Sequence, residues 1–88
     1  MKQGAADTGA RLSVTAHEND NVATLLDDRS TWIEIAGGIT VSAGVPFGHK
    51  IALKDIVEGG EVIKYGVVIG LARTSIRSGE HVHVHNIE

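Results

Sequence analysis

Two neighbouring stretches near the start of the chain carry patterns that predict secondary structure. Apolar and polar residues alternate over residues 12–16, and a period of two is typical of a half-buried β-strand. Helix-capping residue types fill the loop at residues 17–21. We therefore expect the apolar run at residues 22–26 to form one or two short helical turns.

A hairpin and a series of short strands are predicted for the rest of the chain. β-Rich residues at 32–35 and 39–41 flank the pair Gly37 and Gly38, which is typical of a hairpin with a glycine turn. After Pro46 the apolar residues come in short runs that glycines interrupt. The pattern predicts a mostly β fold, compact and convoluted, with one or two short helical turns.

The second half of the chain contains an internal repeat. Residues 56–62 and 76–82 share the frame Ile-x-x-Gly-x-x-Val, and each copy follows a polar residue, Asp55 or Ser75, that can cap a short turn. We expect two similar turns that lead into two similar strands. The alternative is that this match reflects chance or common turn chemistry.

Composition and charge exclude several classes of protein. The chain has 88 residues, 42% of them hydrophobic and 22% charged, which is typical of one folded domain that is small enough to benefit from a partner. The net charge is −3 and the basic residues are scattered, so we expect no nucleic-acid ligand. The absence of cysteine excludes disulfides and thiolate chemistry.

No segment of the sequence is typical of a membrane protein or a secretion signal. No apolar run approaches the roughly 20 residues of a membrane span, so we expect no membrane partner and a cytoplasmic location. Residues 1–10 lack strand or helix periodicity, and we expect a disordered lead or a cloning remnant there. The domain itself is predicted to cover residues 11–88.

The histidines near the C-terminus are the most informative candidates for chemistry. In an extended strand His81, His83 and His85 would point to one face, with about 7 Å between neighbours. Paired His-x-His imidazoles can bind iron, manganese or zinc, although an extended strand rarely directs three residues to one ion. The alternative is that they face solvent or a subunit interface.

A second candidate lies at the junction of a loop and a strand. His49 and Lys50 follow Gly48, which permits close approach of the backbone to a ligand, and the Lys50 ammonium group would suit a carboxylate. A solvated turn is the alternative. The polar loop with His17 is best explained by capping.

Familiar catalytic motifs are missing from the sequence. It contains no glycine-rich nucleotide loop, no Gly-x-Ser-x-Gly motif and too few aromatic residues for a base-stacking platform. A chain of this length built from short strands leaves little room for a walled active site. We therefore do not expect a complete enzyme within it.

Several segments together closely resemble the amino-terminal SAF domain, a β-clip, of altronate and galactarate dehydratases. The resemblance covers roughly residues 11 to 88, and it agrees in both order and spacing. Its segments are 17–23, 48–56, Gly59, 62–66, Ile69 with Gly70, and 79–86. Glu18 and Asn19 depart from the family's pattern, and residues 31–45 contain no motif that can be matched.

The resemblance implies a role in the dehydration of sugar acids. Members of the family dehydrate hexonates or hexarates with a divalent metal, iron or manganese, and related two-subunit enzymes such as sulfolactate sulfo-lyase carry the SAF domain as a separate small chain. This chain would then be the small subunit or amino-terminal domain of a lyase. Its partners would be a large catalytic subunit or domain, which holds most of the metal site, and a small sugar-acid substrate.

The implied reaction removes the proton α to a carboxylate and then expels a β-hydroxyl or β-sulfonate. On this resemblance, His83 and His85 are the expected metal contacts of the small domain, and His49 and Lys50 are expected to bind the substrate carboxylate. Two other functions stay open. One is a stand-alone SAF module for carbohydrate binding or assembly, and the other is a structural domain that holds a homo-oligomer together.

Overall fold

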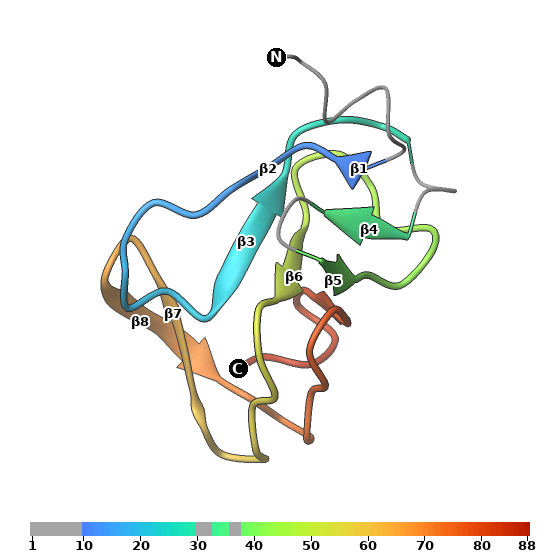
Figure 1. The fold of residues 1–88 in the computed structure, drawn as a ribbon. Coiled ribbons are helices and arrows are strands. Elements are labelled where there is room, and N and C mark those ends of the chain that lie inside the picture. The colour runs from blue at the N-terminus through green and yellow to red at the C-terminus, as the bar shows by residue number, and fades with distance from the viewer. Residues whose placement is uncertain (1–9, 30–32, 36–37) are drawn as a thin grey trace.

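The computed structural model describes residues 10–29, 33–35 and 38–88, which form short strands and no helix (Figure 1). The strands are β1 (Ala10–Arg11), β2 (Ser13–Val14), β3 (Val22–Leu25), β4 (Glu34–Ile35), β5 (Ile39–Thr40), β6 (Lys50–Ala52), β7 (Glu61–Lys64), β8 (Val67–Leu71) and β9 (His81–Val82). The predicted mostly β class is confirmed. Within these described ranges there is accordingly no helix of the length and apolarity needed to cross a membrane.

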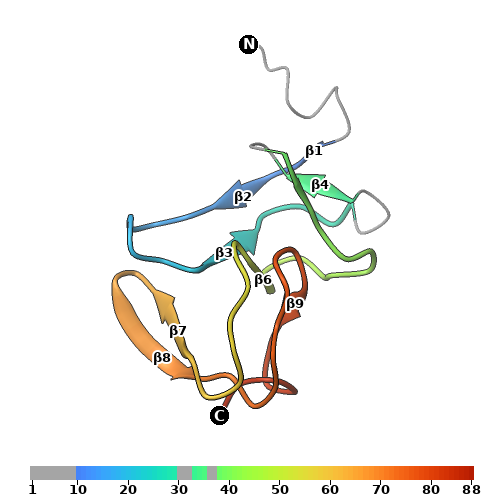
Figure 2. The same cartoon turned by 60° about the horizontal axis from the view of Figure 1, so that its bottom comes forward.

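Three small sheets make up the fold. The central sheet has the order β2-β3-β6-β9, and all of its neighbouring strands are antiparallel. On one side of it lies the sheet β1-β4-β5, and on the other side lies the two-stranded hairpin β7-β8 (Figures 1 and 2). The predicted glycine-turn hairpin is confirmed as β4 and β5, although Gly37 and the start of its first strand lie outside the described residues.

The central sheet is buried on both of its faces. One core cluster contains Val22, Ala52, Ile56, Val62, Ala72, Ile76 and Val82. The other contains Ala23, Leu25, Ile35, Val41, Val45 and Ile51. Neighbouring residues of β3 and β6 therefore belong to opposite clusters, as the alternation of side chains along a strand requires.

This two-sided burial explains why the prediction of helical turns at residues 22–26 is wrong. The segment forms β3, which pairs with β2 on one side and with β6 on the other. A strand buried on both faces needs a nearly continuous apolar run, and four residues are enough to cross this small sheet. Such a run has no helical period, so only its pairing partners distinguish the two structures.

The N-terminal strand prediction is confirmed in part. Residues 12–16 were expected to be one strand, whereas β2 covers only Ser13–Val14 and β1 ends at Arg11. Ala10, from the predicted lead, lies in β1, where it pairs with Glu34 of β4. The other residues of the predicted disordered lead, 1–9, lie outside the described part of the chain.

The internal repeat is confirmed, and its two copies cross each other. Ile56 and Ile76 form an antiparallel bridge in which each N–H donates to the other's carbonyl oxygen at 2.7 Å. Gly59 N–H donates to the Ala72 carbonyl at 2.8 Å, and Gly79 N–H donates to that of Ala52 at 2.7 Å. Each hydrogen bond made by one copy therefore has an equivalent made by the other, as in a local twofold symmetry.

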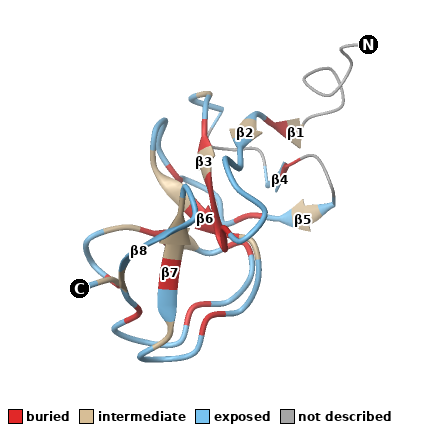
Figure 3. Cartoon of the chain, turned by 90° about the vertical axis from the view of Figure 1, so that its left-hand side faces the viewer, coloured by how far each residue is buried: buried red, intermediate tan, exposed pale blue. Residues whose placement is uncertain are grey.

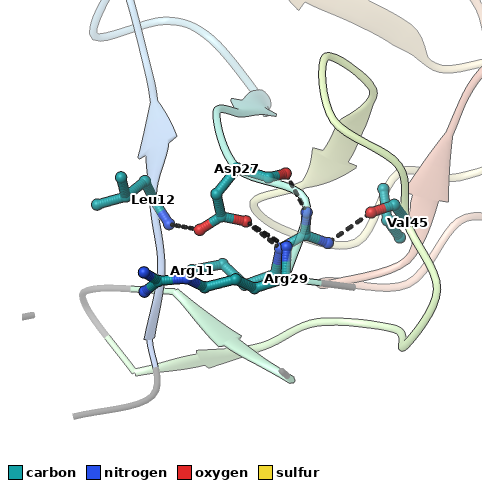
Figure 4. A network of polar contacts seen from close by, with 5 residues as sticks. All are labelled: Arg11, Leu12, Asp27, Arg29 and Val45. Carbon is teal, nitrogen blue, oxygen red and sulfur yellow. Dashed lines mark hydrogen bonds and ion pairs between the residues drawn. The ribbon is translucent and has the colours of Figure 1, made fainter. Parts of the chain in front are cut away.

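A buried ion pair anchors the start of the domain (Figure 4). The Arg11 side chain is only 1% exposed, and its Nε lies 2.8 Å from the Asp27 carboxylate. The same guanidinium donates to the carbonyl oxygens of Asp27 and Val45, while the Leu12 N–H donates to the Asp27 carboxylate. Burial would raise the pKa of Asp27, but the hydrogen bonds from Leu12 and Arg11 lower it below its ordinary value.

The two equivalent repeat glycines should respond differently to substitution by alanine. Both have positive φ, 81° at Gly59 and 86° at Gly79, so each substitution forces a Cβ into a left-handed conformation at roughly 1–2 kcal/mol. A Cβ at Gly59 would meet nothing within 4 Å, whereas one at Gly79 would overlap the Thr40 carbonyl. Urea unfolding should therefore show that Gly79→Ala is destabilised by at least about 3 kcal/mol. Equal losses in the two variants would contradict this packing.

Candidate functional site

His49 is positioned by a tight turn that leads into β6. Its N–H donates to the Pro46 carbonyl at 3.2 Å, and Gly48 has a φ of +82° at the third position of this turn, as a type II turn requires. The His49 carbonyl accepts from Leu25 N–H at 2.9 Å, which attaches the turn to β3. The loop-to-strand position expected for His49 and Lys50 is confirmed.

His81 and His83 do not share an extended strand. β9 ends at Val82, and the following residues form a turn. The Asn86 side chain closes this turn, since its Oδ1 accepts from His83 N–H at 2.9 Å and its Nδ2 donates to the His81 carbonyl at 2.8 Å. The strand predicted through His85 is therefore wrong beyond Val82, because the side chain of Asn86 satisfies backbone groups that a strand partner would otherwise satisfy.

The turn and the sheet register bring three imidazoles together. β6 and β9 pair with Ile51 opposite His81, and the same register continued by two residues sets His49 opposite His83. The rings of His49 and His83 stack with centroids 3.9 Å apart. His49 Nδ1 lies 2.8 Å from His81 Nε2.

These three histidines have the geometry of a metal-binding group. One ring nitrogen from each of His49, His81 and His83 lies within 4.8 Å of the other two, and all three side chains are half-buried. Two nitrogens that bind one ion at about 2.1 Å and at right angles lie about 3 Å apart. The 2.8 Å between His49 Nδ1 and His81 Nε2 is close to this spacing.

His85 lies on the other side of His81. Its ring is exposed and is tilted by 48° against that of His81, with centroids 5.1 Å apart. Both rings border an open polar cleft of about 430 Å³. The other residues of this cleft are Ser42, Thr74, Ser75, Glu80 and Asn86. His85 therefore neighbours the three-histidine group without belonging to it.

Positive charge gathers around the histidines. Partial burial, and after it the charge of Lys64, lowers the pKa of Lys50. Partial burial and the charges of neighbouring groups, including Lys50, lower the pKa values of His81 and His83. Both imidazoles are therefore held in the neutral form that binds metal, beside an ammonium group that can attract an anion.

The polar loop at the start of β3 has a structural role. The Asp20 carboxylate accepts from the N–H groups of Ala16, His17 and Gly66, and the Asn21 side chain bonds to the backbone of β7. Burial would raise the pKa of Asp20, but these backbone hydrogen bonds lower it. The loop has the structural role expected for it, although it precedes a strand and caps no helix. His17 lies in this loop rather than with the other histidines.

Comparison with protein families identifies the fold. Residues 11–88 match the family model described as the altronate/galactarate dehydratase SAF domain. The chain belongs to this family. The resemblance inferred from the sequence is thereby confirmed over the whole of the predicted domain.

Curated relatives of this SAF domain are sugar-acid dehydratases and subunits of a lyase. It is 43% identical over 76 residues to altronate dehydratase of Escherichia coli K12, covering 83% of this chain and 15% of that protein. It is 35% identical over 78 residues to galactarate dehydratase of the same organism, covering 86% of this chain and again 15% of the relative. Over 48 residues it is 54% identical to (2R)-sulfolactate sulfo-lyase subunit alpha of Chromohalobacter salexigens, covering 54% of this chain and 51% of the relative.

One association in this SAF domain is not apparent from the sequence. From the sequence His49 was expected to bind substrate and His83 to act with His85, whereas the structure stacks His49 on His83 and bonds it to His81. The register between β6 and β9 decides this arrangement, and no local pattern in the sequence reports it. The roles of His49, Lys50, His83 and His85 stay predictions.

Asn86→Ala should disturb the histidine group although Asn86 supplies no ligand in it. The substitution removes both hydrogen bonds that close the turn and leaves buried backbone groups unpaired, so we expect a loss of about 1–3 kcal/mol. NMR signals of the imidazoles of His81 and His83 should shift at the same time. Asn19→Ala, in an exposed loop, is the control. Unchanged imidazole signals in Asn86→Ala would contradict this positioning role.

Proposed function

We propose that this SAF domain is the small subunit or a domain of a metal-dependent sugar-acid dehydratase, where it helps to bind metal and substrate beside a larger catalytic part. The observation that carries the proposal is the convergence of His49, His81 and His83 next to Lys50. The names of the dehydratase relatives support the substrate class, and their greater length supports the existence of a larger part.

The donor set suits a divalent transition metal. Three imidazoles leave coordination positions open for substrate, for water or for ligands from the larger part, which would supply the rest of the site. Imidazole favours iron over manganese, so of these two metals iron fits this group better. The metal would act as a Lewis acid that stabilises negative charge on the substrate carboxylate.

The residues of this chain would bind and orient the substrate. His49, His81 and His83 would hold the ion, and the ammonium group of Lys50 would attract the sugar-acid carboxylate. The charge of Lys64 is near enough to lower the pKa of Lys50, so the two positive charges together would attract the carboxylate. His85, which the sequence suggested as a metal contact, borders the polar cleft and would reach the ion only by a change of rotamer.

Metal titration tests the three-histidine group directly. We expect anaerobic calorimetry to show one Fe²⁺ per domain, with Mn²⁺ binding more weakly, and Co²⁺ to give absorption bands typical of nitrogen ligands. Single alanine substitutions at His49, His81 or His83 should each lower the affinity by about tenfold or more. His17→Ala, a histidine outside the group, should bind like the wild type. Equal affinity in all variants would exclude these ligands, and a loss only in His85→Ala would instead support His85.

Enzyme assays test the proposed activity. The enzyme should be isolated from the source cells through a tag on this chain and assayed with altronate, galactarate and sulfolactate. Lys50→Met should raise KM for the accepted acid by about tenfold to a hundredfold, because one charge-assisted hydrogen bond to the carboxylate is lost. Lys54→Met, on an exposed loop, is the matched control. No turnover of any of these acids by the wild-type enzyme would contradict the proposal.

A further inference from the structure

The hairpin of β7 and β8 carries an apolar surface that the described fold leaves uncovered. The exposed fractions are 63% for Tyr65, 58% for Val67, 50% for Val68, 40% for Ile69 and 42% for Leu71. β8 is therefore exposed along most of its length, as its pale blue colour in Figure 3 shows. Exposed apolar residues gathered on one hairpin mark an interaction site more often than singly scattered ones do.

The outer edge of β8 is also open. On one side β8 pairs with β7. On its other side, within the described part of the chain, only its last residue pairs, since Leu71 exchanges two hydrogen bonds of 2.9 Å with Glu88. Among the described residues no further strand pairs with β8 between Val67 and Ile69. Neither lysine nor proline protects this edge, although a shift in the β7-β8 register makes it irregular at Ile69. Such an edge is suited to the addition of a further strand beside Glu88.

We propose that an extended apolar segment of the larger catalytic part of the enzyme pairs with the outer edge of β8 and packs on Tyr65, Val67 and Val68. This inference rests on the proposed function, since that function supplies the partner. The dehydratase relatives support it, because the matched region makes up 15% of their length and the remainder is a much larger protein part that could cover this surface. An apolar strand suits a surface whose exposed side chains carry no charge from Val67 to Leu71.

Site-specific cross-linking in the source cells tests this docking surface. The photoreactive residue p-benzoyl-phenylalanine would replace Val68 in one variant and Val57 in another. Val57 is 71% exposed but lies on a repeat turn outside the hairpin, so it is the matched control. We expect position 68 to cross-link to the larger dehydratase chain, or to the catalytic region of the same polypeptide, at a yield at least tenfold above position 57. Mass spectrometry of the cross-linked peptides identifies the contact.

Two results would overturn the docking proposal. One is a yield at position 68 no greater than at position 57, and the other is cross-linking of position 68 to a second copy of this chain, which would make the hairpin a self-association surface. Val68→Lys should also weaken co-purification of the larger part by at least tenfold, whereas Val57→Lys should not, with circular dichroism confirming that both variants fold. Metal binding by the domain should survive Val68→Lys. Failure of docking is thereby distinguished from failure of the proposed metal site.

Discussion

The reciprocal pair of hydrogen bonds between Ile56 and Ile76 is the constraint on which most of this structure depends. Through these bonds the two copies of the Ile-x-x-Gly-x-x-Val frame cross each other. The valines that end the two copies, Val62 and Val82, therefore enter the same core cluster. That crossing brings the second copy to β6, where β9 pairs with it and sets His81 opposite Ile51. A domain this small obtains its core by using the same turn twice, with a glycine of positive φ in each copy.

The histidine group is a consequence of this pairing. An extended strand would have kept neighbouring same-face histidines about 7 Å apart, a spacing at which two of them can share an ion but three rarely do. The turn closed by Asn86 instead directs His83 back over His49, while the sheet holds His81 beside both. Burial and neighbouring charges lower the pKa values of His81 and His83, which favours the metal-binding form of both, and Lys50 beside them can attract an anion.

Burial is distributed unevenly over the fold. β3 and β6 bury apolar side chains on both faces, whereas β8 exposes apolar side chains along most of its length (Figure 3). The first arrangement is what a small domain needs in order to fold, and the second is what a domain within a larger enzyme would present to its partner. The buried pair of Arg11 and Asp27 lies away from this hairpin, at the junction of β1 with the loop after β3.

The sequence by itself determined the fold class, the repeat and the family. Glycine-punctuated apolar runs indicated short strands, the Ile-x-x-Gly-x-x-Val frame indicated two similar turns, and the motifs around His49 and His81 indicated a SAF domain. These features are local, so they can be recognised without knowledge of distant contacts. Only the tertiary structure decided that residues 22–25 form a strand, because a short apolar run takes the conformation that its neighbours can pair with. It also decided which histidines meet, since strand register brings His49 to His81, 32 positions away in the chain, and the hydrogen bonds of Asn86 close the turn that carries His83.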